Sequence, residues 1–186
     1  MTPRTRTFLS MDIVGSTDAL RRLGLRYAMV LETVRRVLEG AASDRGGVLV
    51  DAVGDSMLFA FGRADDAVLT ALIGQAAIAT APDEIDVDVR MGVHTGPVWE
   101  KGREFIGLTV HKTARVTDVA SGGQILVSSE TLAALGPRLH DHLVFVRRTI
   151  PNLKDFGDDV LYELRVLPAT TAACTEDEMG TVASAG

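Results

Sequence analysis

The hydrophobic and polar positions of the N-terminal region predict a strand followed by a long helix. Residues 7–13, TFLSMDI, form a short apolar run that ends in an acid, which is typical of a central strand. Beyond this run, apolar residues recur at helical spacing to about Ala42. Candidate N-caps for this helix are Ser16, Thr17 and Asp18, because short polar side chains accept hydrogen bonds from the free amides of a first turn.

The rest of the chain alternates strands with helices. The pattern predicts a β-hairpin over 48–61, a helix over 64–81, a strand over 87–99, a helix over 108–120, a strand over 124–128, a short helix within 128–136 and strands over 142–150 and 159–166. The βαββαβ order predicts an α+β fold of the ferredoxin-like type, with one face of the sheet covered by helices. We expect one domain over residues 1–167 and a disordered polar segment over 168–186.

Composition and charge narrow the partners. The chain has 186 residues, of which 46% are hydrophobic and 24% charged, as in ordinary soluble proteins. Its net charge of −6 and pI of about 5.2 argue against general attraction to nucleic acid or an anionic membrane. The single cysteine fits a reducing cytoplasm, and the N-terminus lacks the apolar core of a signal peptide. We therefore expect a cytoplasmic protein with neither nucleic acid nor a membrane as its partner.

One acid in the predicted hairpin has no simple structural explanation. The hairpin reads VLVDAVGDSMLFAF, and its Gly54-Asp55 pair is typical of a turn. Asp51 lies four residues earlier, in a run that otherwise predicts a buried strand. Because an unpaired carboxylate beside a strand core costs several kcal/mol, Asp51 requires a specific partner.

Two acids and a glycine turn predict a site for a metal and a phosphate chain. Asp12 ends the first strand and Asp55 lies at the hairpin turn, so their carboxylates converge if the two strands are adjacent. Mg²⁺ and Mn²⁺ prefer oxygen ligands, often one or two carboxylates plus substrate phosphates. The turn Gly15-Ser16-Thr17 opens a helix whose free backbone amides suit phosphates. The alternative is that Asp12 is only an N-cap and Asp55 only a turn residue.

The predicted helix over 108–120 carries two further candidates. His111 and Arg115 are four residues apart and share one helix face. An arginine directed at a phosphate gives bidentate, permanently charged stabilisation where negative charge develops. The structural alternatives are a solvated surface cation for Arg115 and a neutral, satisfied side chain for His111. We interpret His94, within GVHTG, as structural.

The chain resembles, motif by motif and in order, the class III nucleotidyl cyclase catalytic domain. The stretches that carry this resemblance are FLSMDIVGST, GDSMLFAFG, RMGVHTGPV, EFIGLTVHKTARV and NLKDFGDDVLYEL, and together they span roughly residues 7–166. The resemblance implies that a ribose 3′-hydroxyl attacks the α-phosphate of a nucleoside triphosphate. The products would be pyrophosphate and a 3′,5′-cyclic monophosphate.

The resemblance also implies roles for individual residues. Asp12 and Asp55 match the family's two metal-binding aspartates, and the carbonyl of Ile13 matches its backbone ligand. The cofactors would be two divalent cations, Mn²⁺ or Mg²⁺. Arg115 matches the arginine that stabilises the transition state, and Lys154 matches a triphosphate-binding lysine. The family further implies a head-to-tail homodimer, in which one chain supplies the aspartates and the glycine turn, and the other supplies the arginine, the lysine and the base-reading residues.

Three positions depart from the family's pattern. Asp51 stands where enzymes that make cyclic AMP have a lysine that donates to adenine. Glu104, eleven residues before Arg115, stands where an aspartate or threonine is common. His111 replaces the asparagine that orients the ribose, and a neutral imidazole can still donate to a ribose oxygen. We therefore interpret Asp51 and Glu104 as base-reading residues, and His111 as a catalytic residue beside Arg115.

An acid at position 51 favours a base that presents a hydrogen-bond donor. Adenine is disfavoured because a carboxylate cannot donate to its N1 acceptor, whereas guanine, uracil and cytosine all present donors. A remodelled base pocket also resembles the bacterial pyrimidine cyclases, which make cyclic UMP or cyclic CMP as an antiviral signal for a downstream receptor. We predict a pyrimidine cyclase. The alternatives are a guanylate or adenylate cyclase, an inactive nucleotide-binding regulatory domain, and a relative of polymerases or diguanylate cyclases, which the lack of a GGDEF-type run disfavours.

Overall fold

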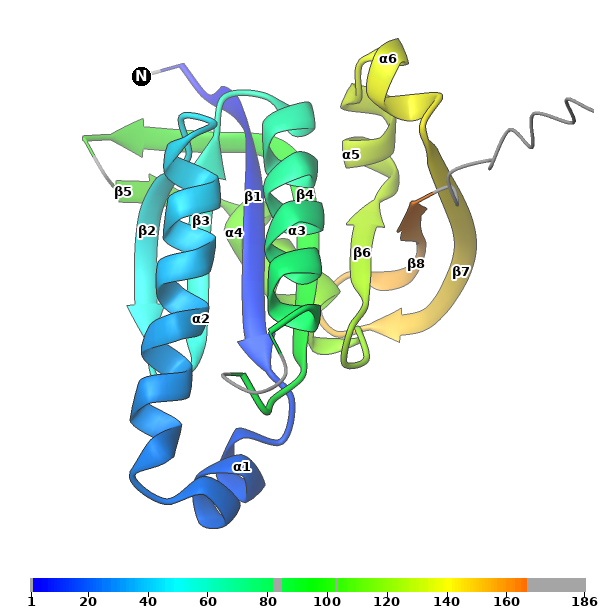
Figure 1. Cartoon of the computed structure of the whole chain (residues 1–186). Helices are drawn as coiled ribbons and strands as arrows, with labels where there is room; N and C mark the ends of the chain where they lie inside the picture. The colour runs from blue at the N-terminus through cyan, green and yellow to red at the C-terminus, as the bar shows by residue number, and fades with distance from the viewer. Residues whose placement is uncertain (1, 82–84, 103, 167–186) are drawn as a thin grey trace, which may run out of the picture.

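The fold is built on a mixed sheet whose central strands lie far apart in the sequence. The computed structural model describes residues 2–81, 85–102 and 104–166. The strand order is β2-β3-β1-β4-β6-β8-β7, with β5 paired to β4 outside this path (Figure 1). The strands are β1 (Arg4–Ile13), β2 (Val48–Val53), β3 (Ser56–Phe61), β4 (Val89–Lys101), β5 (Glu104–Ile106), β6 (Ile125–Ser128), β7 (Leu143–Leu153) and β8 (Gly157–Val166). The βαββαβ order and the hairpin are therefore confirmed.

Helices cover both faces of this sheet, so the expectation of one covered face is wrong. The helices are α1 (Ser16–Leu23), α2 (Arg26–Ser43), α3 (Ala64–Ala79), α4 (Leu108–Asp118), α5 (Ser129–Ala134) and α6 (Pro137–His140). Leu9 and Met11 of β1 are buried in one cluster with residues of α2 and α3. Phe8 lies in a different cluster, against which Val110 of α4 packs. Because successive side chains of a strand point to opposite faces, β1 has helices on both sides, with α4 behind the sheet in Figure 1.

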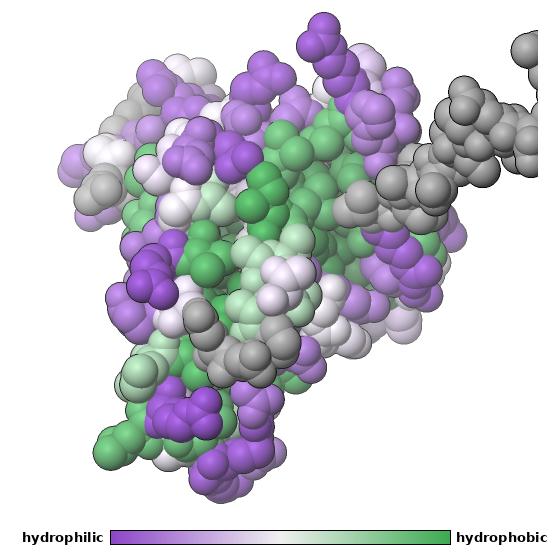
Figure 2. All heavy atoms as spheres, viewed as in Figure 1, coloured by the Kyte–Doolittle hydropathy of each residue, from purple (hydrophilic) through white to green (hydrophobic). Residues whose placement is uncertain are grey.

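The long helix predicted after the first strand is two helices. Gly24 has φ 56° and ψ −130°, a conformation that ends α1 and that only glycine adopts readily. The N-cap of α1 is Gly15, so the expectation of a cap at Ser16, Thr17 or Asp18 is wrong. Figure 2, viewed as in Figure 1, shows hydrophobic atoms at the surface of the corner between α1 and α2.

Two short elements have no counterpart in the sequence pattern. β5 has three residues, and α6 has four, so neither is long enough to show a period. Within the ranges that the structure describes, no helix combines the length and apolar composition of a membrane span. The predicted domain limit at residue 167 and the polar segment after it lie outside the described residues.

Candidate active site

The structure places the two candidate metal aspartates at the same end of neighbouring strands. Met11 of β1 pairs with Met57 of β3, so Asp12 lies beside Ser56. The Ser56 hydroxyl donates to Asp12 Oδ1 over 3.0 Å. Asp55 directly precedes Ser56, in the two-residue turn between β2 and β3. The adjacency on which the sequence argument depended is therefore present.

Arg90 of β4 contacts Asp12, and the sequence reasoning missed it. Its Nε and Nη2 donate to Asp12 Oδ2 over 3.1 and 2.6 Å, and its Nη1 donates to the carbonyl of Asp118 over 2.8 Å. Asp12 and Arg90 are directly opposite in the β1–β4 ladder. This pair could have been predicted from the β1–β4 register. That register cannot be derived without knowing that β1 and β4 are neighbouring strands.

The residues present fit a divalent cation. Asp55 has no hydrogen bond or ion pair within the described part of the chain, so its carboxylate is available as a ligand. No group of three or more His, Cys, Asp or Glu residues with metal-binding geometry occurs among the described residues. Two carboxylates and the carbonyl of Ile13 would thus leave coordination positions for phosphate oxygens, as Mg²⁺ and Mn²⁺ sites commonly do. A bound cation would compete with Arg90 for Asp12 Oδ2.

The glycine turn after β1 is shaped for backbone contact with an anion. Gly15 has φ 62° and ψ 35°, and its carbonyl accepts from the amides of Asp18 and Ala19. The amides of Ser16 and Thr17 fall in the first turn of α1, where backbone donors have no acceptor within the helix. These amides are the donors that a phosphate chain would use.

Tyr27 of α2 also faces this end of the sheet. Nothing in the sequence around Tyr27 indicates that it belongs to the site. Burial raises the pKa of the Tyr27 hydroxyl above its usual value, and the negative charge of Asp55 and then of Asp12 raises it further. A hydrogen bond with Ser16 acts in the opposite direction. The hydroxyl therefore lies among the aspartates and the glycine turn.

Arg115 contacts Asp155, the residue that directly follows Lys154 in the chain. Arg115 of α4 donates from Nη1 to Asp118 Oδ2 over 3.1 Å and from Nη2 to Asp155 Oδ2 over 3.3 Å. Its Nε is buried without a hydrogen-bond partner within the described residues. Lys154, Asp155 and Phe156 form the turn between β7 and β8, and Lys154 and Asp155 are exposed. His111, one helical turn before Arg115, is also exposed.

A β-bulge explains how Asp51 avoids the core. Leu49 pairs with Phe59, but Asp51 pairs with Leu58, so Val50 is an extra residue in β2. Strict alternation would give Asp51 the face of Leu49, which packs against the main core. The bulge moves Asp51 to the face of Leu58, where it is exposed. The expectation of a buried strand around Asp51 is therefore wrong, since no residue of β2 is fully buried.

Asp51 borders a small cavity on the α4 side of the sheet. The cavity has a volume of about 120 Å³ and is lined by Ser10, Asp51, Val53, Ser56, Met57, Leu58, Val110 and Ala114. Glu104, on β5, is exposed and does not line it. The structure thus brings Asp51, but not Glu104, to the cavity beside α4.

This fold is that of nucleotidyl cyclase catalytic domains. The catalytic core of a rhodopsin–guanylyl cyclase with converted specificity, in complex with ATPαS, has a TM-score of 0.78 at 21% identity and covers 89% of this chain and 98% of its own. The adenylyl cyclase CyaB from P. aeruginosa has a TM-score of 0.77 at 19% identity and covers 90% and 96%.

The chain belongs to the Adenylate and Guanylate cyclase catalytic domain family, whose sequence profile matches residues 5–164. An uncharacterised protein of Mycobacterium tuberculosis is 33% identical over 129 residues, which are 68% of this chain and 44% of that protein. An adenylate cyclase of Streptomyces coelicolor is 32% identical over 120 residues, 63% of this chain and 31% of that protein. The chain therefore spans less than half the length of these curated relatives.

Proposed function

We propose that this protein is a nucleotidyl cyclase that converts a nucleoside triphosphate to a 3′,5′-cyclic monophosphate and pyrophosphate. The observation that carries the proposal is the position of Asp12 and Asp55 at one end of adjacent strands, in a chain of the cyclase family. These carboxylates and the carbonyl of Ile13 would hold two divalent cations, Mn²⁺ or Mg²⁺. When bound, such cations lower the pKa of the attacking hydroxyl and neutralise phosphate charge.

The remaining residues would bind and orient the substrate. The amides of Ser16 and Thr17 would donate to the triphosphate at the turn made by Gly15, and Lys154 would add a cation. Arg115 would stabilise the negative charge that develops during attack on the α-phosphate, as a planar guanidinium can donate two parallel hydrogen bonds. His111, one turn away on the same face, would orient the ribose.

We propose that these residues act in a head-to-tail homodimer. The exposed positions of His111 and Lys154 in the single chain suit a role in a site shared with a second copy. One chain would supply the aspartates and the glycine turn, and its partner would supply Arg115 and Lys154. A guanylyl cyclase domain from Blastocladiella emersonii with this fold, TM-score 0.73, is described as a non-canonical dimer.

We propose a pyrimidine as the base. The carboxylate of Asp51 is an acceptor, which matches N3–H of uracil or the amino group of cytosine, and the small cavity beside it suits a single ring. Glu104 would approach the base only from β5, outside this cavity. The product, cyclic UMP or cyclic CMP, would act in the cytoplasm as an antiviral second messenger read by a receptor protein. Guanine, which also presents donors, is the alternative.

The decisive experiment supplies all four nucleotides together. Purified protein is incubated with Mn²⁺ and equal amounts of ATP, GTP, CTP and UTP, and the products are identified by mass spectrometry. We expect the wild type to make cyclic UMP or cyclic CMP. The Asp51→Ala variant should discriminate less between the four nucleotides. Cyclic GMP or cyclic AMP would contradict the pyrimidine assignment. If a well-folded dimer binds nucleotide with Mn²⁺ but releases no pyrophosphate, the protein is a nucleotide-binding regulatory domain.

A further inference from the structure

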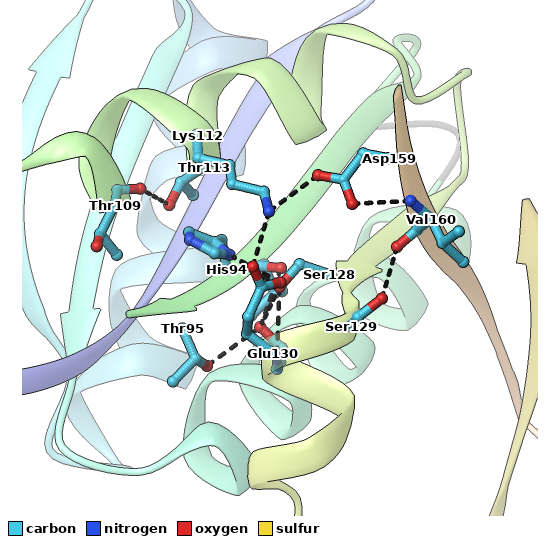
Figure 3. Close-up of polar contacts among 12 residues, drawn as sticks. His94, Thr95, Thr109, Lys112, Thr113, Ser128, Ser129, Glu130, Asp159 and Val160 are labelled. Atoms are coloured by element: carbon cyan, nitrogen blue, oxygen red, sulfur yellow. Dashed lines mark hydrogen bonds and ion pairs between the residues drawn. The ribbon is translucent and has the colours of Figure 1, made fainter. Parts of the chain in front are cut away.

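Lys112 of α4 makes an ion-pair cluster on the side of the helix that faces β8 and α5. Its Nζ donates to Glu130 Oε1 over 2.8 Å and to Asp159 Oδ2 over 2.9 Å (Figure 3). The side chain is 13% exposed, and that of Asp159 is 16% exposed. Glu130 lies in the first turn of α5, and Asp159 lies in β8. One ammonium group therefore joins three elements.

The surroundings of Lys112 make stability a poor explanation for this cluster. The adjoining cavity has a volume of about 430 Å³, and most of its lining is apolar, including Val98, Trp99 and Phe156. Burial disfavours the charged form of Lys112, but the hydrogen bonds to Glu130 and Asp159 outweigh it and raise the pKa of the ammonium. The pair of Lys112 with Asp159 is mostly buried, whereas the Glu130 side chain is 47% exposed. Buried ion pairs are commonly no more stabilising than a well-packed apolar side chain, and their best-attested role is to specify geometry.

The geometry that Lys112 specifies is the placement of α4 on the β7–β8 hairpin. Two ion pairs, Lys112 to Asp159 and Arg115 to Asp155, join these elements beside the apolar packing of Val116 and Ala120 against Leu161 and Ile150. Lys112 and Arg115 are three residues apart on α4, and Asp155 and Asp159 lie on either side of the start of β8. The second ion pair uses the guanidinium that the proposed reaction needs, so Lys112–Asp159 is the ion pair that would persist when Arg115 turns to a phosphate, and it would set the direction in which the apolar contact is held.

We propose that Lys112 is a positioning residue that, by holding Asp159, sets the separation between Arg115 and Lys154. Lys154 lies in the hairpin turn that Asp159 anchors, and Arg115 lies on the helix that carries Lys112. Both cations must meet one triphosphate, so their separation determines how well its phosphates are bound. The inference rests on the proposed function and adds a residue that does not touch the substrate.

The two acids of the cluster provide a matched comparison. Asp159→Asn and Glu130→Gln each remove one carboxylate charge from Lys112, but only Asp159 lies on the hairpin that bears Lys154. We expect Asp159→Asn to raise KM for the nucleotide about ten-fold, the scale of a misplaced binding group, with kcat less affected. Glu130→Gln should leave KM within about two-fold of wild type and lower the melting temperature no more than Asp159→Asn does, because the Glu130 side chain is 47% exposed. Equal changes in KM for both variants would overturn the proposal, because they would indicate a general loss of structure.

A second series separates charge from position. Lys112→Met should raise KM as much as Asp159→Asn does. The double variant, with both substitutions, should have a KM no higher than either single variant, because each substitution removes the same contact. Lys112→Arg should restore part of the affinity, and Arg138→Met, which removes an exposed cation of α6, serves as the charge control. Affinity for inorganic pyrophosphate in the presence of Mn²⁺, measured by calorimetry, should fall in parallel with KM.

The outcomes distinguish this proposal from the proposed function. If the wild-type protein makes no cyclic nucleotide from any of the four triphosphates, the proposed function fails, whatever the variants do. If the wild type is active and Lys112→Met folds, keeps its KM and binds pyrophosphate as tightly, the positioning role is wrong.

Discussion

At the scale of single residues, the site combines two partly buried aspartates with arginines that already have partners. Arg90 occupies one oxygen of Asp12 and also holds the carbonyl of Asp118. Arg115 is held by two carboxylates of its own chain. These contacts must loosen when a cation and a triphosphate bind, so substitutions at each partner have predictable directions.

The first prediction concerns Arg90 and metal affinity. Replacing Arg90 with Met removes the cation that competes for Asp12 Oδ2, so Mn²⁺ should bind more tightly in the absence of nucleotide. The pair is partly exposed, so we expect an effect of about 1 kcal/mol, or roughly five-fold in the dissociation constant. Calorimetry with Mn²⁺ alone measures it. Asp12→Asn should weaken binding in the same assay, and a variant at Arg90 that binds Mn²⁺ more weakly would contradict the competition.

The second prediction concerns His94. Its hydrogen bonds favour the interpretation that it has a structural role. His94 Nδ1 lies 2.8 Å from the Ser128 hydroxyl, within a buried network of hydroxyl groups (Figure 3). Burial lowers the pKa of His94 to about 4, although Glu130 and Asp159 act to raise it and Lys112 acts to lower it. In the unfolded chain its pKa is about 6.5, so between these values only the unfolded state binds the proton. Stability should therefore fall as the pH drops from about 6.5 towards 4.

The measurement compares wild type with His94→Gln. Urea unfolding at several pH values gives the slope of the free energy of unfolding, to which one proton contributes about 1.4 kcal/mol per pH unit. We expect the variant to be less stable at pH 7 but to lose stability less steeply below pH 6.5. Identical slopes for the two proteins would contradict the prediction, because they would mean that His94 has the same pKa in the folded and unfolded states.

At the scale of elements, glycines set how closely α4 approaches β4. A Cβ added at Gly92 would lie 2.5 Å from the backbone nitrogen of Thr117 and 2.9 Å from its Cα. Such contacts with backbone cannot be relieved by a rotamer change, so α4 would have to move away from the sheet. Because α4 carries His111 and Arg115, this packing also sets the position of the proposed catalytic groups.

The third prediction compares two glycines that serve different purposes. Gly92→Ala should destabilise the fold by about 3 kcal/mol or more, through the collision with α4. At Gly15 a Cβ would meet nothing within 4 Å, so Gly15→Ala should cost only the strain of a left-handed conformation, about 1 kcal/mol. Chemical denaturation of both variants tests the difference. A Gly15→Ala variant as unstable as Gly92→Ala would mean that the turn is held by more than its backbone conformation.

At the scale of the whole molecule, the proposed site is complete only when two chains meet. In the single chain, Arg115 pairs with its own acids, and Arg90 neutralises Asp12. A homodimer would present Arg115 and Lys154 of one copy to the aspartates of the other. The isologous arrangement would create two equivalent sites, each built from both chains.

The fourth prediction is complementation between inactive variants. Asp55→Ala and Arg115→Ala should each be inactive as homodimers. In an equal mixture, about half of the dimers are mixed, and each has one intact site of two, so about a quarter of wild-type activity should return. The measurement is cyclic nucleotide formation after subunit exchange, verified by mass spectrometry of the intact dimers. A mixture that stays inactive despite exchange would refute the shared site.

Sequence alone determined the features that depend on local periodicity and on residue chemistry. Patterns within single elements were enough to predict the alternation of strands and helices, the hairpin at Gly54-Asp55 and the acid at the end of β1. Such patterns depend only on residues that are near one another in the sequence. His111 and Arg115 could be named as candidates because their spacing places them on one helix face, whereas Lys154 was named only from the resemblance to the cyclase family.

Only the tertiary structure decided which residues face one another across elements. The extra residue Val50 turns Asp51 out of the core, the β1–β4 register brings Arg90 to Asp12, and Lys112 reaches Asp159 across more than forty positions. Each of these contacts depends on strand register or on helix placement. Strand register and helix placement both result from packing the whole core, where long-range side-chain contacts override the local pattern. A hydrophobic period of two or of 3.6 residues identifies a strand or a helix, but it does not say which element lies beside it.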